Sequence, residues 1–180
     1  MRAKQFWAAI TARVTTEDRA WVNDVLSPKE ASLFWQMNLP DQQHAIRVAR
    51  SAMELAKDAA DVDRDLLLRA ALLHDVGKVK GDVSTADKVL TVIGHKFAPR
   101  MMRSWGREGR GGRIDNLRHA CYVYFYHPQR SADLLRKIDA EEELTELVLH
   151  HHDNMMSESG LSLRCFGGRM RCINIRDFCR

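Results

Sequence analysis

The amino-acid sequence predicts an all-α protein, a compact bundle of several helices within a single domain over residues 1–180. Three observations favour this fold class. Apolar residues recur at the three- and four-residue spacing of amphipathic helices. Helix-capping residues precede several of these segments. No segment alternates apolar and polar residues in the way that a half-buried strand does. The length is that of one domain with a substantial core.

Three short helices are predicted before residue 41, as an extension of the bundle over residues 1–40. Residues 4–13 carry apolar side chains on one side. Thr16 is predicted to cap the second helix, which has acidic residues in its first turn. Ser27 begins a capping box with Pro28 at the first position of the third helix. We interpret these helices as core and cover, because they carry no plausible chemistry.

The centre of the chain carries an unusual pair of polar residues. Asp41 is predicted to cap a fourth helix that reaches about residue 58, and an apolar helix follows that ends in Leu-His74-Asp75-Val-Gly77-Lys78. A helix that is apolar all round is buried, and a buried charge is costly unless it is paired or bound to a metal. Gly77 is a good left-handed helix terminator. We therefore expect a metal site at His74 and Asp75.

Residues 79–119 form the least regular part of the sequence. Ser84 is predicted to cap a helix to residue 93, and a basic, glycine-rich loop is predicted over residues 94–113. Six basic residues and one acidic residue between Lys96 and Arg113 give a net charge of +5. Such a loop can bind nucleic acid or a phosphorylated substrate, although a solvated loop is the commoner role. His95 and His119 are interpreted as structural or exposed.

Further histidines follow in the last part of the chain. Pro128 is predicted to begin a helix with His127 at its N-cap. Another helix is predicted to start near residues 139–142 and to reach three consecutive histidines. At 100° per residue, the apolar face of that helix continues through His151, with His152 and His150 on opposite flanks. His151 is therefore the best inward-facing ligand, His152 the second and His150 the last.

The side chains that these helices present form a ligand set of imidazoles and carboxylates. The four cysteines include no CxxC pair and are interpreted as reduced thiols. Histidine with carboxylate, and without paired cysteine, suits one or two borderline or hard catalytic metal ions, such as Mn, Fe, Zn, Ni or Mg. A structural zinc site fits less well.

In this order, the motifs resemble those of the HD superfamily of metal-dependent phosphohydrolases, whose signature is H…HD…D. His44 matches the first histidine, and His74-Asp75 matches the HD pair in the form of the HDIG subgroup. His127 and the pair His151-His152 match the elements of members with two metals. No Gly-Tyr-Pro element follows, so the chain does not resemble the HD-GYP group. The resemblance covers residues 41–153 and leaves 154–180 as an atypical tail.

The resemblance implies an HD-domain-like bundle and a set of functional residues. Asp75 is implied to bridge two metals, Lys78 to contact a phosphoryl oxygen as a catalytic and substrate-binding residue, and Arg47 either to face the substrate or to form a surface ion pair. Asp177 is the only candidate for the final aspartate. The implied metal ligands are His44, His74, Asp75, His127, His151, His152 and Asp177.

The implied activity is hydrolysis, by metal-activated water, of a phosphoester in a nucleotide or a related small molecule. Two alternatives stay open. The first is a catalytically degenerate HD-fold module that binds a nucleotide or a protein, and the second is nucleic-acid binding through the basic loop, on charge alone. No run of eighteen apolar residues and no signal-peptide core occurs. We therefore expect a cytoplasmic protein without a membrane partner.

Overall fold

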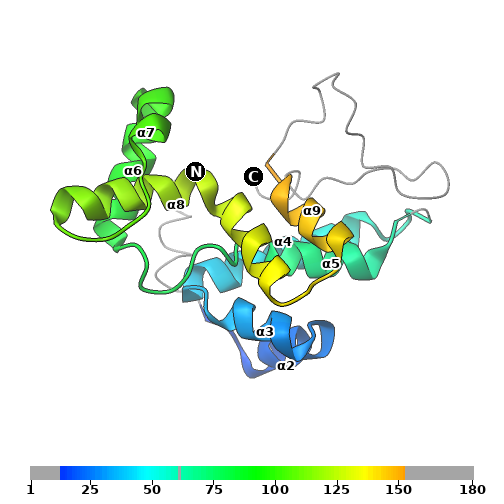
Figure 1. The fold of residues 1–180 in the computed structure, drawn as a ribbon. Coiled ribbons are helices and arrows are strands. Elements are labelled where there is room, and N and C mark those ends of the chain that lie inside the picture. Colours follow the sequence, from blue (N-terminus) through cyan, green and yellow to red (C-terminus); the bar gives the residue numbers. More distant parts are fainter. Residues whose placement is uncertain (1–12, 61, 153–180) are drawn as a thin grey trace, which may run out of the picture.

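The computed structural model describes residues 13–60 and 62–152, and over these ranges the chain is helical (Figure 1). The described residues contain no strand; their only β-type pairing is an isolated bridge between Met37 and Val79. The predicted all-α class is confirmed. The helices are α2 (Thr16–Val25), α3 (Pro28–Trp35), α4 (Leu39–Leu55), α5 (Arg64–Leu73), α6 (Thr85–Phe97), α7 (Pro99–Trp105), α8 (Arg113–Lys137) and α9 (Glu142–Leu149).

The body of the molecule is built around α5. Helix α4 packs along α5, α9 lies beside both α5 and α8, and α2 and α3 cover α5 from another side (Figure 1). Leu72 and Leu73 at the end of α5 are completely buried, in a core that includes Phe34, Leu135 and Leu144. The apolar run of α5 therefore lies inside the molecule, as its sequence predicts.

Most of the capping residues predicted at the starts of helices lie within one residue of the observed caps. Ser27 and Ser84 accept hydrogen bonds at the starts of α3 and α6 as predicted. The cap of α2 is Thr15 in place of Thr16, because Thr15 and Asp18 form the capping box. Helix α4 begins earlier than predicted, after Asn38, so that Asp41 lies in its first turn. The predicted helix over residues 4–13 lies outside the described residues except for residue 13.

The predicted loop over residues 94–113 is largely helical, and that prediction was wrong. Helix α6 continues to Phe97, and Pro99 begins α7 at the position where a proline is best tolerated. Within this range only Ala98 and residues 106–112 lack helical structure. Helices α6 and α7 pack on each other and on α8, and they project from the body with the first half of α8 (Figure 1). We call these three segments, residues 85–126, the arm.

The predicted helix start at Pro128 was also wrong, because Pro128 lies inside the 25-residue helix α8. A proline within a helix leaves the carbonyl four residues earlier without its backbone donor. That carbonyl belongs to Tyr124, and its oxygen lies 2.9 Å from Nδ1 of His127. The histidine side chain thus replaces the missing amide, and the helix continues through the proline.

Gly77 does not end α5 by a left-handed conformation, because the glycines with positive φ in the described chain are Gly81 and Gly109. Its role is close packing. A Cβ atom at Gly77 would lie 2.6 Å from the carbonyl oxygen of His127 and 2.9 Å from the backbone nitrogen of Ser131. The Gly77 N–H donates to Ser131 Oγ (2.8 Å), and this hydroxyl donates to the His74 carbonyl (2.9 Å). Glycine therefore lets α8 approach the turn.

We predict that Gly77→Ala destabilises the protein by about 1–3 kcal/mol, because the added methyl group meets backbone atoms of α8. Gly94→Ala is the matched control. The three atoms nearest to its Cβ all belong to the flexible side chain of Met102, and alanine in a helix interior gains up to about 1 kcal/mol over glycine. Urea unfolding monitored by circular dichroism measures both. Equal stability of the two variants would contradict the packing role of Gly77.

Candidate metal centre

Six of the seven predicted metal ligands lie in the described chain, and the structure brings all six together. They form two groups, and within each group one ligand atom per residue lies within 4.8 Å of the others. The first group is His44, His74 and Asp75; the second is His127, His151 and His152. They come from α4, the end of α5, α8 and the turn after α9. Asp177 lies outside the described residues.

Asp75 joins the two groups. One carboxylate oxygen, Oδ2, lies 3.3 Å from Nε2 of His74, and the other, Oδ1, lies 3.3 Å from Nε2 of His127. Oδ1 is also 2.7 Å from Nζ of Lys78. The whole residue is only 2% exposed. Each oxygen of the carboxylate therefore faces a different histidine group, which is the placement that a bridging carboxylate requires.

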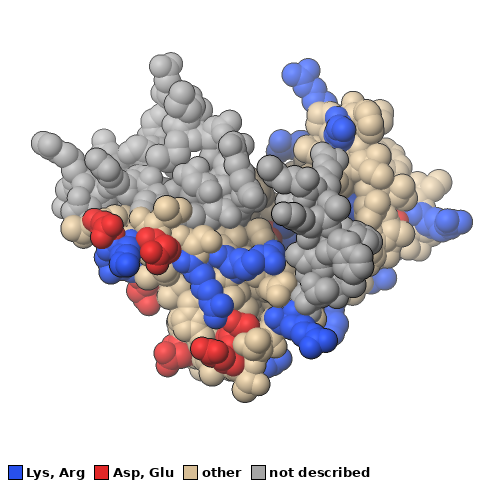
Figure 2. All heavy atoms as spheres, turned by 180° about the vertical axis from the view of Figure 1, so that it is seen from behind, with Lys and Arg blue, Asp and Glu red and all other residues tan. Residues whose placement is uncertain are grey.

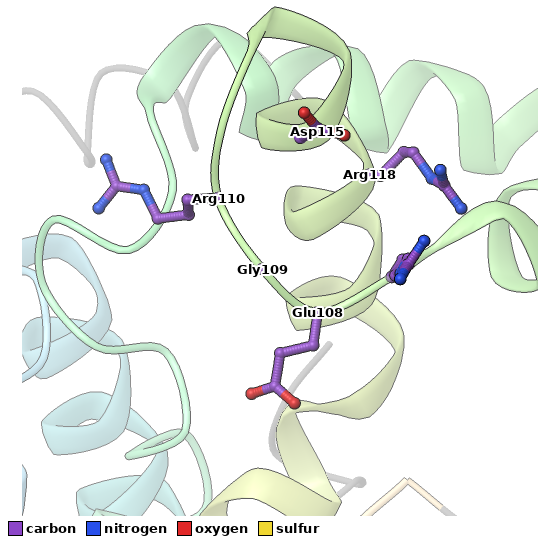
Figure 3. A pocket seen from close by; sticks show the side chains of 6 residues that line it. Glu108, Gly109, Arg110, Asp115 and Arg118 are labelled. Carbon is purple, nitrogen blue, oxygen red and sulfur yellow. The ribbon is translucent and has the colours of Figure 1, made fainter.

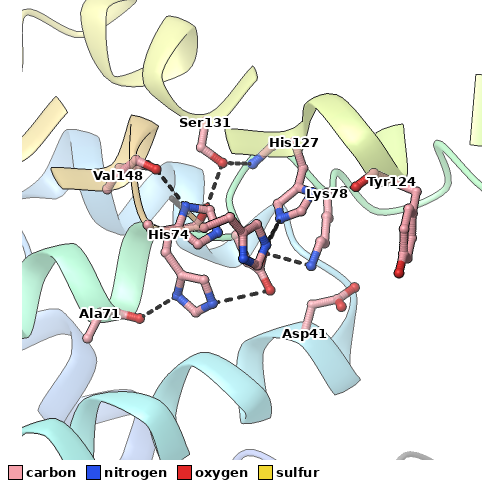
Figure 4. Close-up of polar contacts among 12 residues, drawn as sticks. Asp41, Ala71, His74, Lys78, Tyr124, His127, Ser131 and Val148 are labelled. Atoms are coloured by element: carbon pink, nitrogen blue, oxygen red, sulfur yellow. Dashed lines mark hydrogen bonds and ion pairs between the residues drawn. The ribbon is translucent and has the colours of Figure 1, made fainter. Parts of the chain in front are cut away.

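Backbone carbonyls orient three of the imidazoles (Figure 4). Nδ1 of His74 lies 2.8 Å from the carbonyl oxygen of Ala71. Nδ1 of His127 lies 2.9 Å from that of Tyr124, and Nδ1 of His151 lies 2.6 Å from that of Val148. A carbonyl oxygen only accepts hydrogen bonds, so Nδ1 carries the proton in each ring. In the neutral imidazole the lone pair is then on Nε2, as a metal ligand needs.

The charge state of the cluster suits a cation. Burial lowers the pKa of His44 to about 4 and that of His151 to about 3, and it also holds the pKa of His127 well below its ordinary value. Burial opposes ionisation of Asp75, but Lys78, His74 and His127 outweigh it and hold the Asp75 pKa well below 3.8. At neutral pH His44, His127 and His151 are therefore neutral imidazoles and Asp75 is a carboxylate, the forms that bind metals.

One buried atom of the cluster bears on whether its residues suit a metal ion. Nε2 of His151 is buried and has no hydrogen-bond partner within the described ranges. Buried polar atoms are normally satisfied, so an orphaned one needs an explanation. This atom belongs to the second ligand group and carries a lone pair, because Nδ1 of the same ring is bonded to Val148. A metal ion in this group would supply the missing partner.

The three consecutive histidines approach the cluster to different degrees. His151 is 1% exposed. His152 is exposed, but its Nε2 lies 3.0 Å from Nε2 of His127. His150 lies outside both groups, and its Nε2 is 3.3 Å from a carboxylate oxygen of Glu146 on the surface. The order of approach to the cluster is the one that the helical spacing predicts.

Lys78 and Arg47, the two predicted substrate-binding residues, occupy different surroundings. Lys78 lies at the edge of the cluster, beside Asp75, with 26% of its side chain exposed. Arg47 is exposed on α4 and donates to the side-chain oxygen of Gln43 (3.3 Å), a neutral partner in place of the acidic one that a surface ion pair requires. Its charge contributes to lowering the His44 pKa.

The sequence prediction missed a second, partly buried network, which holds the segment after the HD pair against α8. Asp82 accepts from Arg130 at 2.6 Å and contacts Nε2 of His119 at 2.7 Å. His119 is buried, in agreement with a structural role. No local pattern marks these residues, because Asp82 is separated from its partners by 37 and 48 positions.

The glycine-rich turn that follows α7 holds a separate cavity of about 270 Å³ (Figure 3). Its side chains do not converge. Arg110 and Arg118 point to opposite sides and Glu108 points away from both (Figure 3). Arg110 donates to the Gly81 carbonyl (3.0 Å), and Asp115 accepts from the Gly112 N–H (3.1 Å). The turn therefore offers no assembled anion site of the kind that its basic composition suggests.

The family of HD domains matches residues 42–179, and the chain belongs to this family. HD domains bind divalent metals and are generally metal-dependent phosphohydrolases. The matched range includes Asp177. No curated protein and no solved structure matches the chain. Among the helices that the structure describes, none is long and apolar enough to cross a membrane.

We predict that the metal-free protein loses stability as the pH falls from about 6.5 towards 4. In this range the unfolded histidines bind protons, whereas His44 and His151 stay neutral until about pH 4 and pH 3. The free energy of unfolding should fall by a few kcal/mol, since one pKa unit is worth about 1.4 kcal/mol. Urea unfolding at several pH values measures this. His44→Gln should flatten the curve, and a flat wild-type curve would contradict the burial of neutral imidazoles.

Proposed function

We propose that this protein is a metal-dependent phosphohydrolase that cleaves a phosphoester of a nucleotide or a related phosphorylated small molecule. The observation that carries the proposal is the pair of histidine groups joined by Asp75. Membership of the HD domain family supports the same reaction class. The convergence of these six side chains supports a working centre over a degenerate module that binds without turnover.

Each residue of the cluster has a defined part in this proposal. His44, His74 and Asp75 would hold one divalent metal, and His127, His151 and His152, with the second oxygen of Asp75, would hold another. Metals bound there supply Lewis acidity towards a phosphoryl oxygen and lower the pKa of water, so that it becomes a nucleophile at neutral pH. The carbonyls of Ala71, Tyr124 and Val148 keep three Nε2 atoms turned inward.

Among the residues that the structure describes, Lys78 is the one best placed to act on the substrate. Its ammonium group lies 2.7 Å from Asp75 and retains partial exposure to solvent, so it can reach a phosphoryl oxygen at the mouth of the cluster. A fixed cation there offsets the negative charge that develops during the transfer of a phosphoryl group. The same charge helps to keep Asp75 ionised before the substrate binds.

We predict that His151→Ala removes bound metal and phosphohydrolase activity, whereas His150→Ala keeps both. The two residues are neighbours, but only His151 belongs to a ligand group, and His150 is directed to Glu146. Elemental analysis and hydrolysis of a panel of nucleotides and p-nitrophenyl phosphate with Mn²⁺ measure the two properties. The same loss in both variants would contradict the assignment of the ligands.

We predict that Lys78→Gln lowers kcat/KM by about 10²–10³-fold, the usual effect of removing one group that stabilises transition-state charge. Metal content should be unchanged, because Lys78 is not a ligand. Lys57→Gln is the matched control, since Lys57 is exposed beyond the end of α4 and contacts Glu54. Activity that survives in Lys78→Gln would show that Lys78 serves only to balance the charge of Asp75.

A further inference from the structure

Helix α6 has its polar side turned towards the protein. The residues of α6 that are buried or half-buried are polar or small, and Thr91 is 1% exposed. Specific contacts fix this orientation. Thr91 Oγ1 lies 3.8 Å from the sulfur of Cys121, and Lys88 Nζ lies 3.1 Å from a carboxylate oxygen of Asp41. Nδ1 of His95 and the hydroxyl of Tyr124 share a hydrogen bond of 3.2 Å. The inward-facing residues are Asp87, Lys88, Thr91, Gly94 and His95.

The opposite side of α6 is apolar and faces solvent. Five large apolar side chains on it are between 48% and 78% exposed, and they cover an arc of about 160° at 100° per residue. Met101 of α7 (62% exposed) and Ile114 of α8 (68% exposed) add to the same arm. A soluble helix normally buries its apolar side. The apolar face of α6 consists of Val89, Leu90, Val92, Ile93 and Phe97.

The arm is also strongly basic. Residues 96–113 carry six basic residues and one acidic residue, a net charge of +5, and all six basic side chains are exposed. Around the axis of α6, Lys96 lies between Val92 and Val89, within the exposed arc. From behind, the arm shows lysine and arginine side chains projecting around a surface of other residues (Figure 2). An exposed apolar surface of this kind marks an interaction site.

The positive charge of the arm indicates which kind of partner binds the apolar face of α6. A second copy of the chain would bring two arms of net charge +5 together, and that association is opposed by repulsion. An anionic surface is instead attracted. An arc of about 160° is wider than the seam through which one helix packs on another, whereas a lipid interface receives apolar side chains over a broad arc. Long basic side chains can extend from such an interface to the headgroups.

We propose that the arm docks on an anionic lipid surface, with the exposed side of α6 at the boundary between headgroups and acyl chains. This inference goes beyond the hydrolase proposal and is independent of it. It needs no spanning helix, so it is compatible with the lack of one among the described helices. It replaces the sequence-based expectation of no membrane partner, which rested on the missing spanning segment.

The test is co-sedimentation of the full-length protein with lipid vesicles. We expect binding to phosphatidylcholine vesicles that contain about 30% phosphatidylglycerol, weaker binding to phosphatidylcholine alone, and a decrease with added salt. The double variant Ile93→Gln/Phe97→Gln should lower the bound fraction at least about tenfold, because each large apolar side chain that is buried contributes tenfold or more to partitioning. Both positions are exposed, so the variant should fold normally.

Leu55→Gln is the matched control, because Leu55 is 68% exposed at the end of α4, outside the arm. It should bind vesicles as the wild type does, and both variants should keep the wild-type metal content. Vesicle binding that the double variant retains would overturn the proposal, as would a lack of binding by the wild type. A third outcome would assign the face to a second copy of the chain: the wild type forms a dimer in light scattering and does not bind vesicles, and the double variant is a monomer.

Discussion

The structure depends on one buried charge, the Asp75 carboxylate at the end of a core helix. At 2% exposure an uncompensated carboxylate would cost several kcal/mol, so the fold has to surround it with positive or metal-ligating groups. It does so from three directions: Lys78 after the turn, His74 on the same turn and His127 on α8. The helices that bring these groups together are also those that bury the apolar run of α5.

Several backbone features that are unusual in isolation make sense around this carboxylate. Gly77 removes the methyl group that would keep α8 away, and Ser131 ties the two backbones together through the Gly77 amide and the His74 carbonyl. Pro128 frees the Tyr124 carbonyl, which then holds His127 with Nε2 directed at Asp75. Packing, helix geometry and the orientation of the ligands are therefore parts of the same contact between α8 and the end of α5.

The features of this arrangement that depend on neighbouring residues were predicted from the sequence, and those that depend on tertiary contacts were not. Helical period placed His151 inward, and capping residues marked the starts of α3 and α6, because these signals act within one or two turns. Pro128 was misjudged because the side chain that compensates for it is visible only in the folded helix. The apolar residues of α6 show a helical period, but a period alone does not tell which face meets the protein. The contacts of Asp82 span too many residues to leave a local pattern.

The central claim is that the histidines and Asp75, and not the cysteines, bind the metal. Titration of the metal-free, full-length protein with Co²⁺, followed by absorption spectroscopy, tests it most directly. The account predicts saturation at one or two equivalents, with weak visible bands from nitrogen and oxygen ligands and no intense thiolate-to-cobalt band in the near ultraviolet. A strong thiolate band would contradict it and would place the metal at Cys121, Cys165, Cys172 or Cys179. The absence of saturable binding would contradict it equally.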